Sequence, residues 1–489
     1  MSQNTGAASS SVALSLTALG RVAKRALGYI ARPIDPERRV RNAARFEELP
    51  PHLKTVDQVM GRWHHACGAT HGVYERCNFA CTSCYLTSEA NAVPPLPPAQ
   101  VYGQLDELRA FLGPQGKAQI TAGEVTLLPV DVLGDYVAYA LRIGLDPMVM
   151  SHGQTFLDDP PYLERLVATY GLRKISIHVD VTQRGRRGWK PGTQERDWHP
   201  LRDRYARLIR HVRRKTGRAL YAASTVTVTE ANLSGVADVI DWVASNADAV
   251  RMISFQPVAA VGRTQDPTGA PSLETVWTEV CRGFGRSDLN PHPFLYGHPS
   301  CNAVVPLVVV DVGRRRHVIE LARSDRAWDR AFLGRLFQAA GGFTTIGEPP
   351  WTSVAKLFGL ALRSPRLLLE MPFYGLYRLW GERRWLPRLL LGALTLRRIR
   401  MRPLAVVVHD FMSPEQLDTP EGQERLQACV FQVPIEGEMV PMCTLNATDL
   451  RLRVNRKLRM ELSPDKGAPQ AASVRKEPAE SERVEKVRA

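Results

Sequence analysis

The segment YERCNFACTSCYLTSEAN (residues 74–91) gathers three of the chain's eight cysteines within eight residues. Cys77, Cys81 and Cys84 form a C-x3-C-x2-C pattern just after a short β-rich run, GVYE (72–75). Thiolates with this spacing on one tight loop can converge on separate irons of a cubane cluster. Three protein ligands leave one iron open, and an unsaturated metal is where a small molecule binds. Structural zinc is the alternative, but no fourth ligand follows at zinc-finger spacing.

The composition is that of a globular protein, and its positive net charge predicts an anionic partner. The 489 residues are 44% hydrophobic and 23% charged, with a net charge of +15. This length predicts two domains plus extensions, and the charge suits nucleic acid, a phospholipid surface or an acidic substrate. The first twenty residues lack the basic start of a signal peptide, and no window of eighteen apolar residues occurs. We therefore expect a reducing, cytoplasmic environment, in which clustered cysteines are metal ligands or catalytic thiols.

Between residues 73 and 257 short β-rich runs alternate with segments of helical periodicity. The runs are GVYE, AQITA, PMVMS, KISIHVDV, LYAASTVTV and VRMISFQPV. Six strand–helix repeats predict a parallel sheet with helices outside, whether open or curled. After about residue 265 the alternation stops. The expected organisation is an N-terminal helix and linker (1–45), a core (46–265), a C-terminal domain (266–462) and a disordered tail (463–489).

Two segments have the character of amphipathic helices that meet an anionic surface. Apolar residues recur at helical spacing from Val12 to Ile30, with basic residues beside them. Residues 354–402 combine eleven basic and two acidic residues with many Leu, Phe, Tyr and Trp. Each segment is either an ordinary helical layer or a lipid-facing surface at the headgroup level. Because the cations are interleaved with aliphatic residues, we do not expect nucleic acid as the partner.

A second motif stands about forty residues after the cysteines, at the end of the second expected strand. The sequence ITAGEVTLLP (120–129) contains Gly123, Glu124 and Thr126. Together the two motifs resemble the signature of the radical S-adenosylmethionine (radical SAM) superfamily, whose second motif is G-G-E-P-T. Here Ala122 replaces the first glycine and Val125 replaces the proline. Because alanine is small, Ala122 still allows another group to come close to the backbone at this position, unless the position needs a positive φ.

This resemblance implies a fold and a chemistry. The family fold is a partial (β/α)6 barrel, in agreement with the six expected strands. The implied cofactors are a [4Fe-4S] cluster on the three cysteines and S-adenosyl-L-methionine, whose amino and carboxylate groups chelate the open iron. A reducing partner such as flavodoxin or ferredoxin supplies the electron. Cleavage of the sulfonium then gives methionine and a 5′-deoxyadenosyl radical that abstracts hydrogen, while Gly123, Glu124 and Thr126 place the methionine part.

Further polar residues are expected at the carboxyl ends of the strands, where such barrels place their chemistry. Ser176 and His178 alternate with apolar residues in KISIHVD and would point inward. Ser151 and His152 end the third expected strand, and Gln256 lies on the sixth. Contact with the cofactor's ribose or the substrate is one interpretation, and a structural hydrogen-bond network is the other.

The C-terminal cysteines suggest a second metal site. Cys429 and Cys443 flank an expected hairpin through IEGE (435–438), and Cys301 could join them from a distance. Alternatively, they are buried apolar cysteines without a metal. The segments 298–302, 407–418 and 428–451 resemble the tetraether lipid synthase group of radical SAM enzymes. That resemblance implies an auxiliary iron–sulfur cluster on Cys301, Cys429 and Cys443 in a C-terminal α+β domain.

The fourth ligand of this auxiliary cluster stays open: Cys281, Cys67, a group other than cysteine, or none. The archaeal synthases carry further cysteines just before the radical SAM loop, whereas this chain has Cys67 alone there. We therefore expect that the additional iron centre of those enzymes is absent here and that the reaction differs from joining two chains.

The sequence thus predicts a radical SAM enzyme that abstracts hydrogen from an unactivated C–H of a membrane lipid or similar hydrophobic substrate, with C–C bond formation among the outcomes. It would be cytoplasmic or peripheral on the inner face of an anionic membrane. The alternatives are a peptide-modifying radical SAM maturase with an auxiliary cluster and a non-catalytic iron–sulfur electron carrier.

Overall fold

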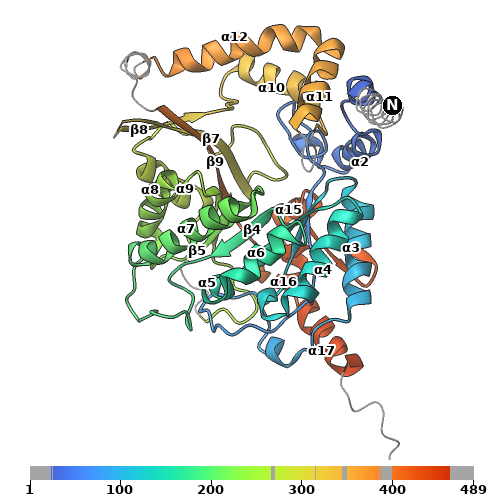
Figure 1. Ribbon diagram of the computed structural model, residues 1–489, viewed down its shortest axis with the longest axis vertical. Coiled ribbons are helices and arrows are strands. Elements are labelled where there is room, and N and C mark those ends of the chain that lie inside the picture. The colour runs from blue at the N-terminus through green and yellow to red at the C-terminus, as the bar shows by residue number, and fades with distance from the viewer. Residues whose placement is uncertain are drawn as a thin grey trace, which may run out of the picture.

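The computed structural model describes residue 24, residues 26–265, 270–313, 315–343 and 350–383, residues 385 and 387, and residues 399–462 (Figure 1). Of the predicted N-terminal helix, residue 24 and residues 26–31 are helical, and the rest of that helix lies outside the described residues. The expected disordered tail (463–489) lies outside them as well.

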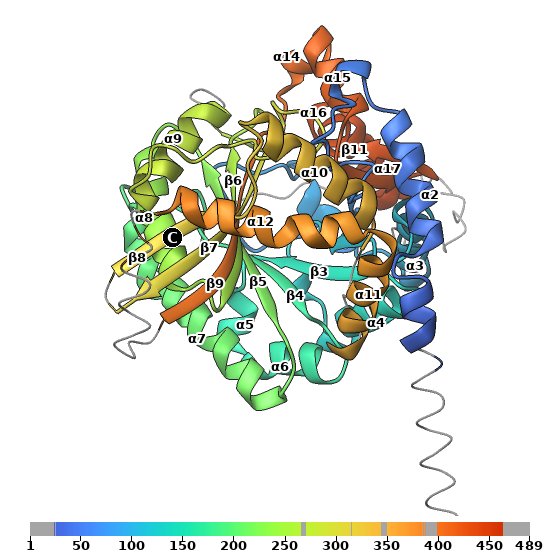
Figure 2. The same cartoon turned by 90° about the horizontal axis from the view of Figure 1, so that it is seen from above.

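One curled sheet of eleven strands forms the centre of the molecule (Figure 2). Six neighbouring strands run parallel in chain order. They are β1 (Cys67–Ala69), β2 (Lys117–Ile120), β3 (Asp146–Ser151), β4 (Lys174–His178), β5 (Tyr221–Val228) and β6 (Val250–Pro257). The fold is therefore mixed α/β, with a curled parallel sheet as its core.

The first strand lies earlier in the chain than the sequence predicts. The run GVYE (72–75) forms a turn region, and three residues from Cys67 to Ala69 make β1 instead. Gly72 adopts a φ of +69°, which turns the chain away from the sheet at that point. The prediction was wrong because β-branched and aromatic residues also suit the buried turn that leads to the cysteines.

Helices cover the outer face of the parallel strands (Figures 1 and 2). They are α3 (Pro98–Leu112), α4 (Val130–Arg142), α5 (Gln154–Asp158), α6 (Pro160–Ala168), α7 (His199–Thr216), α8 (Val236–Ser245) and α9 (Leu273–Phe284). In α3 the buried residues Val101, Leu105, Leu108 and Leu112 follow helical spacing, so one apolar stripe packs on the sheet. The main hydrophobic core lies between these helices and the strands.

The C-terminal segment adds strands to both edges of this sheet. On one edge β9 (Ile399–His409) pairs parallel to β6, and β7 (Asn302–Val312) and β8 (Arg315–Glu320) follow in antiparallel order. On the other edge β10 (Phe431–Ile435) pairs parallel to β1 and antiparallel to β11 (Glu438–Pro441). The predicted hairpin through IEGE is confirmed: Glu436 and Gly437 both have positive φ, as a two-residue hairpin turn requires.

The remaining helices gather at the two ends of the sheet (Figure 1). At one end lie α2 (Pro36–Glu47), α10 (Ala327–Ala340), α11 (Pro350–Arg363) and α12 (Pro365–Gly381). The other C-terminal helices are α14 (Pro414–Leu417), α15 (Pro420–Gln427), α16 (Met442–Ala447) and α17 (Leu450–Leu462), of which α16 and α17 lie toward the opposite end. Within the described ranges, no helix has the length and hydropathy needed to span a bilayer.

The participation of β9 in the sheet can be tested with two substitutions in that strand. Leu404 is buried and Met401 is exposed. We expect Leu404→Ala to lower the free energy of unfolding by about 2–5 kcal/mol, because it leaves a cavity beside β6. Met401→Ala should change it by less than about 0.5 kcal/mol. Denaturant titration measures both, and equal effects would contradict the placement of β9.

Candidate functional site

A cavity of about 220 Å³ lies at the carboxyl ends of the parallel strands. Its wall includes Cys77, Cys81, Cys84, Gly123, Glu124, Ser151, Ser176, His178 and Gln256. These nine residues, all proposed from the sequence, thus share one cavity. Thr126 is not in its described wall, but donates hydrogen bonds from its backbone N–H and its hydroxyl to Glu124.

The cysteine loop is fixed by neighbouring loops of the sheet. The backbone N–H groups of Ala80 and Thr82 donate to the carbonyl oxygens of Arg184 and Thr182, after β4. The N–H of Cys84 donates to Thr264 Oγ1 at 3.2 Å, after β6. Backbone contacts on both sides of the curl therefore hold the three thiols at the mouth of the cavity.

Burial and the charge of Arg263 act in opposite directions on the pKa of Cys77 and of Cys81. Burial raises the pKa of Cys77 to about 11 and raises the pKa of Cys81 further. Burial alone would lower the pKa of Arg263, but the nearby Cys84, Cys77 and Cys81 raise it. None of the eight cysteines, all of which the structure describes, forms a disulfide. A bound cation would displace the thiol protons.

Gly123 lies where the strand-end backbone touches the cysteine loop. A Cβ at this position would come within 2.3 Å of the carbonyl oxygen of Glu75 and 2.5 Å of that of Arg76. The N–H of Glu124 donates to the same Arg76 oxygen at 2.9 Å. Ala122 is outside the positive-φ region, so alanine is compatible with the backbone there. Only a glycine permits the close approach at 123.

The Glu124 carboxylate joins the ends of β2 and β3. It accepts hydrogen bonds from Ser151 Oγ at 2.7 Å and from the N–H of His152 at 2.8 Å, in addition to Thr126. Oε1 takes the bonds from Ser151 and Thr126, whereas Oε2 takes that of His152 N–H. His152 Nε2 also lies 3.3 Å from Oε2, but its hydrogen is shared with Asn78, so Oε2 retains a lone pair for a further donor. Glu124 is therefore buried yet still able to accept from a ligand in the cavity.

His152 connects β3 to the cysteine loop. Its ring stacks on Phe79 with centroids 3.9 Å apart, and its Nε2 lies 2.8 Å from Asn78 Oδ1. Nδ1 accepts the N–H of Gln154, so Nε2 carries the hydrogen and donates to Asn78. Burial lowers the pKa of His152 to about 4, which keeps the ring neutral. Sequence reasoning named His152 but missed Phe79 and Asn78, because they lie far from it in the chain.

The predicted polar face of β4 points into the curl. Ser176 Oγ lies 3.0 Å from Thr225 Oγ1 on β5, and His178 contacts Asp180. The Asp180 carboxylate also accepts the N–H of Thr227 at 2.7 Å. Burial would raise the pKa of Asp180, but the neighbouring His178 and the hydrogen bonds lower it to about 2. Ser176 and His178 thus line the cavity and also belong to a hydrogen-bond network.

The second set of cysteines comes together from opposite edges of the sheet. Cys301, at the start of β7, lines a small cavity with Cys429 and Cys443, which precede and follow the β10–β11 hairpin. The N–H of Phe431 donates to Cys429 Sγ and that of Met412 to Cys443 Sγ, each at 3.4 Å. Hydrogen bonds to the sulfurs are one of the means by which proteins tune iron–sulfur clusters.

Arg425 is the charged neighbour of this second set. Its Nε donates to Cys301 Sγ at 3.2 Å, and its Nη2 donates to the carbonyl oxygen of Asp410 at 2.9 Å. Burial raises the pKa of Cys301 to about 11, although the Arg425 charge opposes the shift. Sequence reasoning missed Arg425, because nothing in its spacing from Cys301 marks it.

Among the described residues, neither Cys67 nor Cys281 lines the cavity of the second set. Cys67 Sγ lies 3.6 Å from the Tyr296 hydroxyl, and Cys281 packs in the main core. Cys443 also borders the larger cavity, so the two sites share a wall. The polar residues that line the cavity of the second set include His409, Asp410 and Asn302.

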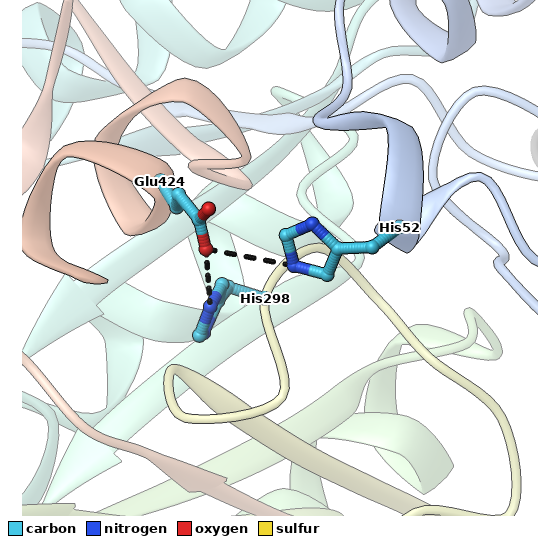
Figure 3. A group of neighbouring side chains, drawn as sticks. All are labelled: His52, His298 and Glu424. Atoms are coloured by element: carbon cyan, nitrogen blue, oxygen red, sulfur yellow. Dashed lines mark ion pairs between the residues drawn. The ribbon is translucent and has the colours of Figure 1, made fainter. Parts of the chain in front are cut away.

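Figure 3 shows a further cluster beside this site, formed by His52, His298 and Glu424. The ring nitrogens of His52 and His298 lie 3.5 and 3.9 Å from Glu424 Oε2. The N–H of Ser300 donates to Nδ1 of His298, so Nε2 carries the hydrogen that faces Glu424. Burial lowers the pKa of His298 and keeps it neutral. In this arrangement His298 offers no free lone pair to a metal.

Comparison with known proteins assigns no family to this chain. No family model matches the chain, and no curated protein matches it. Among solved structures it is similar to a histidine-tagged chain described as "anSMEcpe with bound AdoMet", with a TM-score of 0.29 and 11% sequence identity. The match covers 39% of this chain and 50% of that one. A similarity this weak carries no argument about function.

The close approach at Gly123 can be tested directly. We expect Gly123→Ala to lower the free energy of unfolding by about 1–3 kcal/mol, because the added methyl meets two backbone carbonyls that cannot move freely. Gly103→Ala, in the middle of α3 with open space around it, is the control and should stabilise by up to about 1 kcal/mol. Denaturation midpoints measure both, and an unchanged Gly123→Ala protein would contradict the contact.

The buried neutral His152 predicts a pH dependence of stability. An unfolded histidine takes up a proton below about pH 6.5, whereas the folded ring does so only near pH 4. The unfolded state therefore binds more protons between these values, and the free energy of unfolding falls as the pH drops from about 6.5 to about 4. Urea titrations at about pH 7.5, 6 and 5 should show a shallower slope for His152→Gln than for the unaltered chain, and equal slopes would contradict this assignment.

Proposed function

We propose that this protein is a radical SAM enzyme whose [4Fe-4S] cluster is held by Cys77, Cys81 and Cys84. The observation that carries the proposal is the single cavity that these thiols share with Gly123 and Glu124. The thiols fit the cluster: they are unpaired with one another, and a backbone N–H already donates to Cys77 Sγ at 3.4 Å. With S-adenosyl-L-methionine bound, the cluster would supply a 5′-deoxyadenosyl radical that abstracts hydrogen.

The residues of this chain bind and orient the cofactor in the proposed reaction. The backbone beside Gly123 and the free capacity of Glu124 Oε2 suit the ammonium group of the methionine part. Ser176, His178 and Gln256 offer hydroxyl, imidazole and amide groups to a ribose in the same cavity. Ser151 and Thr126 hold the Glu124 carboxylate in place. The protein thereby positions the reacting carbon and excludes water.

Part of the cavity wall suits a hydrophobic substrate. The apolar lining residues are Leu86, Val258, Val261, Phe411, Met412, Phe431 and Met442. Apolar lining in a cavity that also presents polar groups favours a substrate whose reacting part is a hydrocarbon chain. We therefore propose a membrane lipid or a similar hydrophobic molecule as the substrate, with hydrogen abstraction from an unactivated C–H and C–C bond formation among the outcomes.

We further propose that Cys301, Cys429 and Cys443 hold an auxiliary iron–sulfur cluster. Their shared cavity, the two backbone N–H donors and the Arg425 guanidinium support this donor set. Because Cys443 borders both cavities, electrons could pass between the auxiliary site and the substrate over a short distance. The proposal includes a flavodoxin or ferredoxin as reductant and a cytoplasmic or peripheral membrane location.

Reconstitution of cysteine variants tests both clusters. After anaerobic addition of iron and sulfide we expect about eight irons per chain, and about four for Cys77→Ala or Cys443→Ala. With dithionite and S-adenosyl-L-methionine, the unaltered chain and the control Cys281→Ala should form 5′-deoxyadenosine, whereas Cys77→Ala should form none. Chromatographic detection of 5′-deoxyadenosine is the measurement.

Three results would contradict the proposal. If the three cysteines bind zinc instead of iron, the proposed radical chemistry is ruled out. If the chain holds its full iron content but forms no 5′-deoxyadenosine, it is an electron carrier. Mass spectrometry of membrane lipids with and without the gene tests the substrate class. An unchanged lipid profile together with the loss of a modified peptide would favour a peptide maturase.

A further inference from the structure

Helix α12 carries an apolar stripe on its outer face. Leu369, Phe373, Leu376 and Trp380 recur at helical spacing and are 63 to 68% exposed. The opposite face of the same helix packs inward through Leu367 and Tyr374, which are buried. A surface helix of a soluble protein normally places charged and polar residues on its outer face. The outer face of α12 is apolar instead.

The preceding helix, α11, has the same property. Val354, Leu357, Phe358 and Leu362 are 52 to 69% exposed, whereas Thr352 and Lys356 on the other side of the helix are buried. Together α11 and α12 hold eleven of the twenty-one exposed large hydrophobic residues found in the described part of the chain. We call the outer sides of these two helices the α11–α12 face. Isolated exposed apolar residues are ordinary, but a concentrated set marks an interaction surface.

The charges along the α11–α12 face are positive. Arg363, Arg366 and Arg383 are exposed on or directly after the two helices. The acidic Glu370 between them is bound by Arg366 and by Arg335 of α10, both at 2.8 Å. The surroundings therefore match an anionic partner.

We propose that the α11–α12 face docks on an anionic lipid bilayer. Its apolar side chains would enter the headgroup region while the arginines meet lipid phosphates, as in helices that lie in the plane of a membrane. Neither helix has the length and hydropathy of a spanning segment, so the two lie on the bilayer. A symmetric dimer through this face would bring the same arginines against each other, which disfavours a second copy as the occupant.

The docking surface is independent of the proposed chemistry. Figure 1 shows α11 and α12 at one end of the sheet, with α16 and α17 toward the other end. Cys443 in α16 borders the candidate site, as do the carboxyl ends of the strands. The bilayer would thus hold the end of the molecule away from the cysteines, and membrane binding can fail without loss of the site.

Vesicle co-sedimentation of the full chain tests the proposal. Vesicles of phosphatidylcholine alone are compared with an equal mixture with phosphatidylglycerol, at low and high salt. We expect binding to the anionic vesicles, weakened by salt, and a loss of about tenfold or more in partitioning for the double variant Phe373→Gln, Trp380→Gln. Met460→Gln is the matched control, because Met460 is similarly exposed on α17 at the far end.

Further measurements distinguish membrane docking from misfolding and from dimerisation. The double variant should unfold at the same denaturant concentration as the unaltered chain and form as much 5′-deoxyadenosine without lipid. Quenching of Trp380 by brominated lipid, lost in Trp380→Phe, would support insertion. The proposal is overturned by absence of sedimentation, by equal loss in Met460→Gln, by equal binding to uncharged vesicles, or by a concentration-dependent dimer that the double variant abolishes.

Discussion

The candidate site depends on one backbone contact, the approach of Gly123 and Glu124 to Glu75 and Arg76. The carbonyl oxygens on the cysteine side lie where any side chain at position 123 would have to be, and the N–H of Glu124 completes the contact with a hydrogen bond. This contact joins the end of β2 to the start of the loop that bears Cys77. It fixes the distance between the thiols and the strand ends, and the shape of the cavity follows from that distance.

A second constraint comes from the curl of the sheet. The C-terminal segment adds β9, β7 and β8 on one side and β10 and β11 on the other. The second set of cysteines flanks these strands rather than lying in them. Cys301 belongs to the first side, and Cys429 and Cys443 belong to the second. A metal cluster on these three residues would join the two sides of the sheet beside the larger cavity. The curvature of the sheet would then depend on whether this cluster is bound.

The candidate site and the α11–α12 face lie at opposite ends of the sheet. The cavity lies at the carboxyl ends of the parallel strands, and the α11–α12 face lies at the other end (Figure 1). If both proposals hold, the bilayer anchors the protein at the α11–α12 face. A hydrophobic substrate would then have to enter the cavity from a different side of the molecule. The apolar wall of Phe411, Met412 and Phe431 then shields the reacting chain from water.

The sequence by itself determined the local patterns. The cysteine triplet, the strand–helix alternation, the β10–β11 hairpin and the inward polar side of β4 follow from spacing and periodicity, which depend on neighbours in the chain. The tertiary structure alone decided the rest: the true β1, the insertion of C-terminal strands at both edges, the stacking of His152 on Phe79 and the placement of Arg425 on Cys301. These depend on contacts between residues far apart in the chain, and such contacts are set by which surfaces pack together, a choice that no local pattern records.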